Sequence, residues 1–99
     1  MAKHEPTMLV ESEGGPEIRQ AIFDAIENQI RDRTPPEVEL ALARLLALGE
    51  PRDNALRYIA CALSVEFFEI LHNETGYDEA RYVRNLQALP QLPYDENAI

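Results

Sequence analysis

The sequence predicts an all-α fold, a compact bundle of four helices, and three observations lead to this class. Apolar residues recur every three or four positions in four segments (about 16–32, 35–48, 52–73 and 78–89), which is the spacing of the buried side of a helix. Proline and glycine stand at the starts of these segments or between them, where helices begin and end. The third segment is apolar on two sides, so we expect the other helices to pack around it.

The first helix is expected over residues 16–32. Pro16 suits the first turn of a helix, and the carboxylate of Glu17 complements the helix dipole there. Gln29 projects from the apolar side, either as an edge residue that reaches solvent or as a buried hydrogen-bonding group. The side facing the core is predicted to consist of Ile18, Ala21, Ile22, Ala25, Ile26 and Ile30.

The second helix, over residues 35–48, has the clearest start signal in the chain. Thr34 is predicted to cap its N-terminus, and Glu37 three places later completes a capping box. Gly49 supplies the left-handed residue that commonly ends a helix. The predicted core positions are Val38, Ala41, Leu42, Leu45 and Leu46. Leu40, Ala43 and Ala47 fall on the other side, either as plain surface or as a close-packing contact.

The third helix, over residues 52–73, is the predicted centre of the bundle. One apolar stripe is formed by Leu56, Ile59, Leu63, Phe67 and Ile70, and a second by Tyr58, Cys61, Val65 and Phe68. Neighbouring helices or a second copy of the chain must cover the second stripe. The apolar run is about 17 residues long and contains charges, whereas a membrane span needs about 20 with few or none, so we expect no membrane span.

The last helix, over residues 78–89, is predicted from its own cap. Asp78 is a good N-cap, and Tyr77 and Tyr82 are spaced to form a hydrophobic staple around it. Pro90 and Pro93 prevent the helix from continuing. Residues 1–15 are expected to form a flexible N-terminal arm and residues 94–99 a loose acidic tail, which leaves a single helical domain at 16–93.

The net charge and the cysteine content narrow the range of functions and cellular locations to expect. The formal net charge is −9, and such a surface repels phosphate backbones, so we expect no direct nucleic-acid binding. The single cysteine, Cys61, cannot form an internal disulfide and is expected to be a small buried side chain. The first residues contain no apolar run of signal-peptide length, and a cytoplasmic location is therefore the default.

Two carboxylates and a histidine on the third helix are the candidates for chemistry. Glu69 and His72 are three positions apart, which is one half of the ligand pattern of di-metal helix bundles, but the other ligands are missing. Glu66 borders the apolar stripe. It is either buried as a general acid or base, or paired at the rim with Arg52, Arg57 or an arginine of the last helix. No complete catalytic, cofactor-binding or metal-ligating set is predicted.

Several capping and packing motifs between about residues 20 and 93 resemble those of a known family. They are 25–29, 35–37, 45–49, 55–59, and Tyr82 with Leu89 and Pro90. The chain resembles a family of short bacterial all-helical proteins classed as a domain of unknown function. The resemblance implies a compact helical domain without an established activity. Relatives carry histidines at the positions of Phe23, Asp53 and Arg57, and since this sequence lacks all three, no metal binding is carried over from them.

These observations favour a small cytoplasmic protein–protein interaction or regulatory module over an enzyme. The module is expected to bind a protein partner or to form a homodimer by self-association through Tyr58, Val65 and Phe68. The alternative is a small metal-dependent or acid–base enzyme that uses Glu66, Glu69 and His72.

Overall fold

The computed structural model describes residues 15–73 and 76–93 of the chain, and all the regular structure in these residues is helical. The four helices are α2 (Gly15–Asp32), α3 (Pro36–Ala47), α4 (Arg52–Asn73) and α5 (Glu79–Ala88). Their bounds agree with the predicted bounds to within one residue, so the all-α prediction is confirmed. The predicted tail and all but the last residue of the predicted arm lie outside the described residues.

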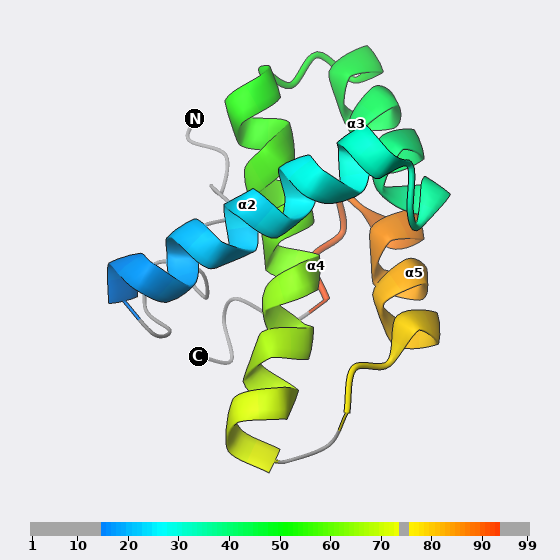
Figure 1. The fold of residues 1–99 in the computed structure, drawn as a ribbon. Coiled ribbons are helices and arrows are strands. Elements are labelled where there is room, and N and C mark those ends of the chain that lie inside the picture. Colours follow the sequence, from blue (N-terminus) through cyan, green and yellow to red (C-terminus); the bar gives the residue numbers. More distant parts are fainter. Residues whose placement is uncertain (1–14, 74–75, 94–99) are drawn as a thin grey trace.

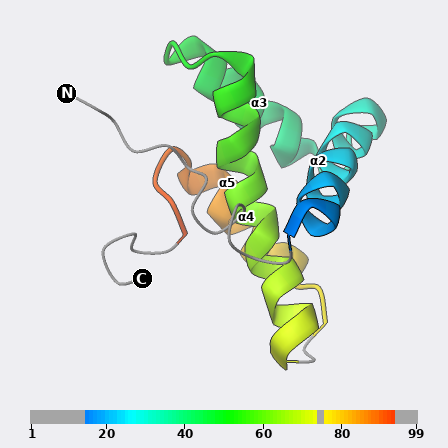
Figure 2. The same cartoon turned by 90° about the vertical axis from the view of Figure 1, so that its left-hand side faces the viewer.

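Helix α4 is the centre of the bundle, as predicted. It runs the length of the molecule, α2 crosses it, and α3 and α5 lie along one side (Figure 1). All three of these helices contact α4. A view turned by 90° shows that the last turns of α4 extend beyond α2 (Figure 2). The middle of α4 is therefore enclosed, whereas its C-terminal end has fewer neighbours.

The core follows from this arrangement. In the middle of α4 the residues from Tyr58 to Ser64 are all buried, which is what two apolar stripes on one helix require. Ile22 and Ile26 of α2, Leu45 of α3 and Leu86 of α5 are also buried in the core. Each of the three outer helices thus contributes an apolar side to the same cluster.

Arg44 fastens α3 to the C-terminal end of α5. Its guanidinium donates hydrogen bonds to the backbone carbonyls of Leu86, at 2.6 Å, and Leu89, at 3.2 Å. The last carbonyls of a helix lack the regular partner one turn later, and Arg44 adds a hydrogen bond to the carbonyl of Leu86, which also accepts from the backbone N–H of Leu89 at 3.3 Å.

The capping box predicted at the start of α3 is wrong. Pro35 is the N-cap residue, no side chain caps the helix there, and the hydroxyl of Thr34 instead donates to the carbonyl of Asp32. Thr34 stands one position too early, because the helix begins at Pro36, and proline has no side-chain acceptor. The predicted end of the helix is confirmed, since Gly49 has a φ of 97°.

Both local predictions at α5 are confirmed. The carboxylate of Asp78, the N-cap, accepts a hydrogen bond from the backbone N–H of Arg81 at 3.0 Å. The rings of Tyr77 and Tyr82 meet edge to face with their centroids 6.1 Å apart. The cap and the aromatic pair together define where α5 begins.

Three residues predicted to lie in the core are exposed: Ala21, Leu46 and Ile70. The spacing of apolar residues predicts which side of a helix faces the core. It does not predict whether another helix covers that side at a given position. Ile70 stands three residues before the C-terminal end of α4, and the last turns of this helix extend beyond α2 (Figure 2). Apolar side chains are therefore exposed at that end of α4.

Candidate functional site

Glu66 is the most deeply buried charged group among the described residues. Its side chain is 1% exposed, and it points toward α5, where it accepts hydrogen bonds from Arg81 Nε at 2.7 Å and Arg81 Nη2 at 2.9 Å. The backbone N–H of Asp78 donates a third, at 2.9 Å. The predicted pairing with an arginine of the last helix is correct, but the Glu66 carboxylate itself is buried, while the Arg81 side chain is 27% exposed.

This arrangement gives Glu66 a structural task. Both oxygens of its carboxylate are occupied, and a guanidinium neutralises its charge, so a substrate has no open approach to it in this structure. The bonds join the C-terminal half of α4 to the first turn of α5, which is only ten residues long. Glu66 therefore fixes the position of a helix that is too short to be stable alone.

Next to this pair, Tyr82 links α5 to α2. Its side chain is fully buried, and its hydroxyl donates to Gln29 Oε1 at 2.7 Å. Gln29 is half-buried and acts as the hydrogen-bonding group that one reading of the sequence expected. Burial raises the pKa of Tyr82 above its usual range, and burial followed by the charge of Glu79 raises the pKa of Tyr77.

Glu69 and His72 do not join Glu66 in a common site. Glu69 accepts a hydrogen bond from Asn73 Nδ2 at 2.9 Å, and the ring of His72 lies 4.4 Å from that of Phe68. Glu66 faces α5, whereas His72 lines a hollow beside α2. Among residues 15–73 and 76–93, no three His, Cys, Asp or Glu side chains lie close enough together to hold a metal ion. The three residues of the enzyme alternative, Glu66, Glu69 and His72, therefore do not form one site.

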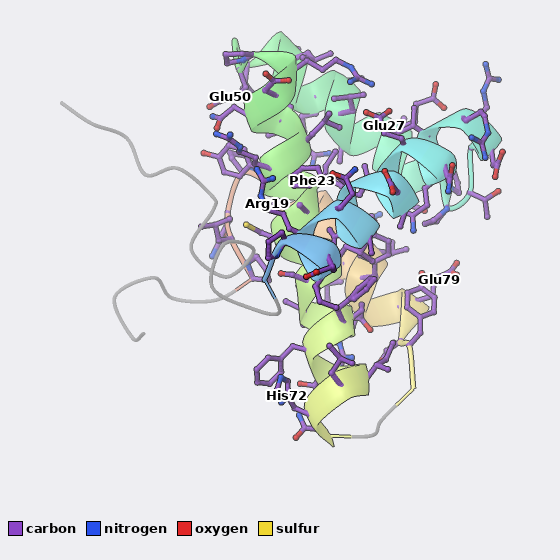
Figure 3. The ribbon with its side chains drawn as sticks, turned by 60° about the vertical axis from the view of Figure 1, so that its left-hand side comes forward. Arg19, Phe23, Glu27, Glu50, His72 and Glu79 are labelled. Carbon is purple, nitrogen blue, oxygen red and sulfur yellow. The ribbon has the colours of Figure 1, made fainter. Side chains whose placement is uncertain are left out.

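The hollow beside His72 is lined mainly by apolar side chains. We call it the α2–α4 groove. Its volume is about 240 Å³, and it is lined by Ile18, Ile22, Ser64, Phe67, Phe68, Leu71 and His72. Figure 3 shows His72 near the C-terminal end of α4, well away from Arg19 and Phe23 of α2. Exposed Ile70 and Leu71 belong to the same end of the helix.

The open apolar surface of α4 differs from the surface predicted for self-association. Of the three residues predicted for self-association, Tyr58 is 8% exposed and already belongs to the core, whereas Val65 and Phe68 are half-buried. Open apolar surface thus lies toward the C-terminal end of α4. The spacing of apolar residues in the sequence includes Phe67 and Phe68 but does not predict the groove, because its other wall is formed by Ile18 and Ile22 of a different helix.

A second hollow, between the same stretch of α2 and the N-terminal part of α4, is lined by more polar side chains. It has a volume of about 210 Å³ and is lined by Arg19, Gln20, Phe23, Asp53, Leu56 and Arg57. The guanidinium of Arg19 stacks over the ring of Phe23, 5.2 Å from its centroid (Figure 3). Phe23, Asp53 and Arg57, which are far apart in the sequence, thus lie around one hollow.

Comparisons of the chain with protein-family models, curated proteins and solved structures found no match. The resemblance to a family of unknown function therefore stays a prediction. In the described part of the chain, no helix combines the length and the apolar character needed to cross a membrane.

Proposed function

We propose that this chain is a small protein–protein interaction module whose binding site is the α2–α4 groove. The observation that carries the proposal is the gathering of Phe67, Phe68 and Leu71 around one hollow beside α2. Leu71 is 57% exposed, and both phenylalanines keep part of their surface open. Apolar side chains collected in a concavity are typical of sites that receive side chains of another protein.

A second copy of the chain is one partner that the proposal includes. Val65 and Phe68 keep open surface near the groove, while the buried Tyr58 contributes little to such a contact. Each copy carries a net charge of −9, so two copies repel each other. Because salt screens this repulsion, we expect weak self-association that becomes stronger as the salt concentration rises.

The proposal also includes a cytoplasmic location. Cys61 is the single cysteine of the chain and is buried, so no disulfide within the chain stabilises the fold. Proteins of reducing compartments fold without such bonds. Fractionation of the source cells tests this point, and recovery of the chain from a secreted fraction would contradict it.

Sedimentation velocity across concentration and salt tests self-association, with two charge-matched variants. Leu71→Asp places a carboxylate at the groove, and Leu40→Asp places one at an equally exposed apolar position on α3, where Leu40 is 62% exposed. We expect the mass of the wild type and of Leu40→Asp to rise with concentration, and that of Leu71→Asp to stay at one chain. Loss of association in both variants alike would mean that the groove is not the contact.

A further inference from the structure

We infer that the partner for which the α2–α4 groove is suited is an amphipathic helix of another protein, with lysines and arginines along the flanks of its apolar side. This inference rests on the proposed function and names the chemistry of the partner. Three features of the described residues lead to it, namely the shape of the groove, the charges around it and the net charge of the chain.

The shape of the groove suits a row of apolar side chains. Its walls are residues four apart on α2, Ile18 and Ile22, and residues three, four and seven positions after Ser64 on α4. The groove is therefore a trough between two helices. Its volume of about 240 Å³ is smaller than the pockets of about 300 Å³ or more that hold drug-sized molecules. A helix with apolar residues at every third or fourth position can fill such a trough.

Acidic residues lie next to groove-lining residues in the sequence. Among the described residues, the lining of the groove contains no lysine, arginine, aspartate or glutamate. Glu17, exposed in the first turn of α2, precedes Ile18, and Glu69 follows Phe68 on α4. The nearest cation on α2 in the sequence, Arg19, lies in the neighbouring hollow, where it stacks over Phe23.

Three other arginines of the described part are paired with groups of the fold. Arg81 pairs with Glu66, Arg52 with Glu27 at 3.3 Å, and Arg44 with backbone carbonyls. A second copy of the chain, with its net charge of −9, is repelled by the first. A helix with basic flanks is attracted to it. Charge therefore favours a basic helix over a second copy as the occupant of the groove.

Three synthetic helical peptides test the inference against the intact chain. They share leucines along one side and carry lysine, glutamine or glutamate along the flanks. Isothermal titration calorimetry measures their binding at low and at high salt. We expect the lysine peptide to bind about tenfold more tightly than the glutamine peptide at low salt, because a few exposed ion pairs add up to that amount. The advantage should shrink as salt rises.

The two aspartate variants separate groove binding from non-specific attraction. Both Leu71→Asp and Leu40→Asp make the chain more acidic by one charge, so an attraction that depends on charge alone strengthens equally in both. Binding in the groove instead weakens at least tenfold in Leu71→Asp, because a carboxylate placed there loses its water when the helix docks. In Leu40→Asp it is unchanged or slightly stronger.

The outcomes distinguish this inference from the proposed function. Equal binding of the lysine and glutamine peptides, with both lost in Leu71→Asp, overturns the basic partner and supports the groove as an interaction site. If no peptide binds but self-association depends on Leu71, the occupant is a second copy and the inference is wrong. If no peptide binds and the chain stays monomeric, both fail. Equal strengthening of lysine-peptide binding in the two variants also overturns the inference.

Discussion

The carboxylate of Glu66 on α4 and the guanidinium of Arg81 on α5 form two parallel hydrogen bonds, of 2.7 and 2.9 Å. The two side chains differ in their access to water. Arg81 is 27% exposed, whereas Glu66 is 1% exposed. Glu66 therefore depends on its partner for solvation, while Arg81 can be hydrated without Glu66.

This asymmetry predicts that the two halves of the pair are not equivalent. Arg81→Met leaves a buried carboxylate without its cation, so we expect the melting temperature to fall by more than about 5 °C. Glu66→Leu leaves an arginine that water can reach, and it should cost less. Arg84→Met, at an exposed position on the same helix, is the matched control. Thermal unfolding followed by circular dichroism measures all three, and a larger loss in Glu66→Leu than in Arg81→Met would contradict the prediction.

Removing the hydroxyl of Tyr82 should destabilise the fold less than removing the Arg81 guanidinium. Tyr82→Phe removes the hydrogen bond to Gln29 Oε1, an acceptor that remains half-buried. We expect a loss of about 1 kcal/mol in the free energy of unfolding, measured by urea denaturation at neutral pH. Tyr77→Phe serves as the control, because Tyr77 is exposed, and it should change stability by less than half as much. Equal losses in the two variants would refute a role for the buried bond.

Tyr82 also predicts how stability depends on alkaline pH. Its pKa in the folded chain is raised by burial, while the unfolded chain ionises at about pH 10. The unfolded state therefore releases its proton first as the pH rises. The stability contributed by the neutral phenol is complete below about pH 10 and is lost progressively above it.

Urea denaturation at a series of pH values from neutral to alkaline tests this dependence. Tyr82→Phe removes the ionising group, so its stability should fall less steeply above about pH 10 than that of the wild type. Parallel curves for the two chains would show that Tyr82 does not contribute to alkaline unfolding.

The two predicted helix caps differ in the structure and should differ in energy. Asp78 accepts a hydrogen bond from the N–H of Arg81, whereas Thr34 does not cap α3. Asp78→Ala should lower the free energy of unfolding by about 1 kcal/mol, and Thr34→Ala should change it by less than about 0.5 kcal/mol. Urea denaturation of both variants provides the comparison. An equal loss of stability in the two variants would contradict this prediction and would indicate that Thr34 does cap α3.

A substitution at Gly49 measures how much a left-handed backbone conformation costs in stability when the residue is not glycine. Its φ is 97°, and a Cβ added there meets no other atom within 4 Å, so Gly49→Ala introduces backbone strain without a clash. We expect a loss of about 1 to 2 kcal/mol. Gly49→Asn should lose less, because asparagine tolerates this conformation better than alanine does. If Gly49→Ala matches the wild type in thermal unfolding, the turn has rearranged and does not require glycine.

The start and end of each helix could be predicted from the sequence because the signals are local. Asp78 caps α5, Gly49 ends α3, and apolar spacing places Ile22 and Ile26 on the buried side of α2. Thr34 shows the limit of such a signal, since the N-cap position is taken by its neighbour Pro35, which has no side-chain acceptor.

The sequence by itself thus determined four helices, their order and a central helix that is apolar on two sides, because each of these follows from residues within about one helical turn of one another. The tertiary structure alone decided that Glu66 meets Arg81, that Tyr58 is buried, and that Leu71 stays open beside Ile18. These outcomes depend on where α2 and α5 cross α4, and packing between residues far apart in the chain sets that geometry.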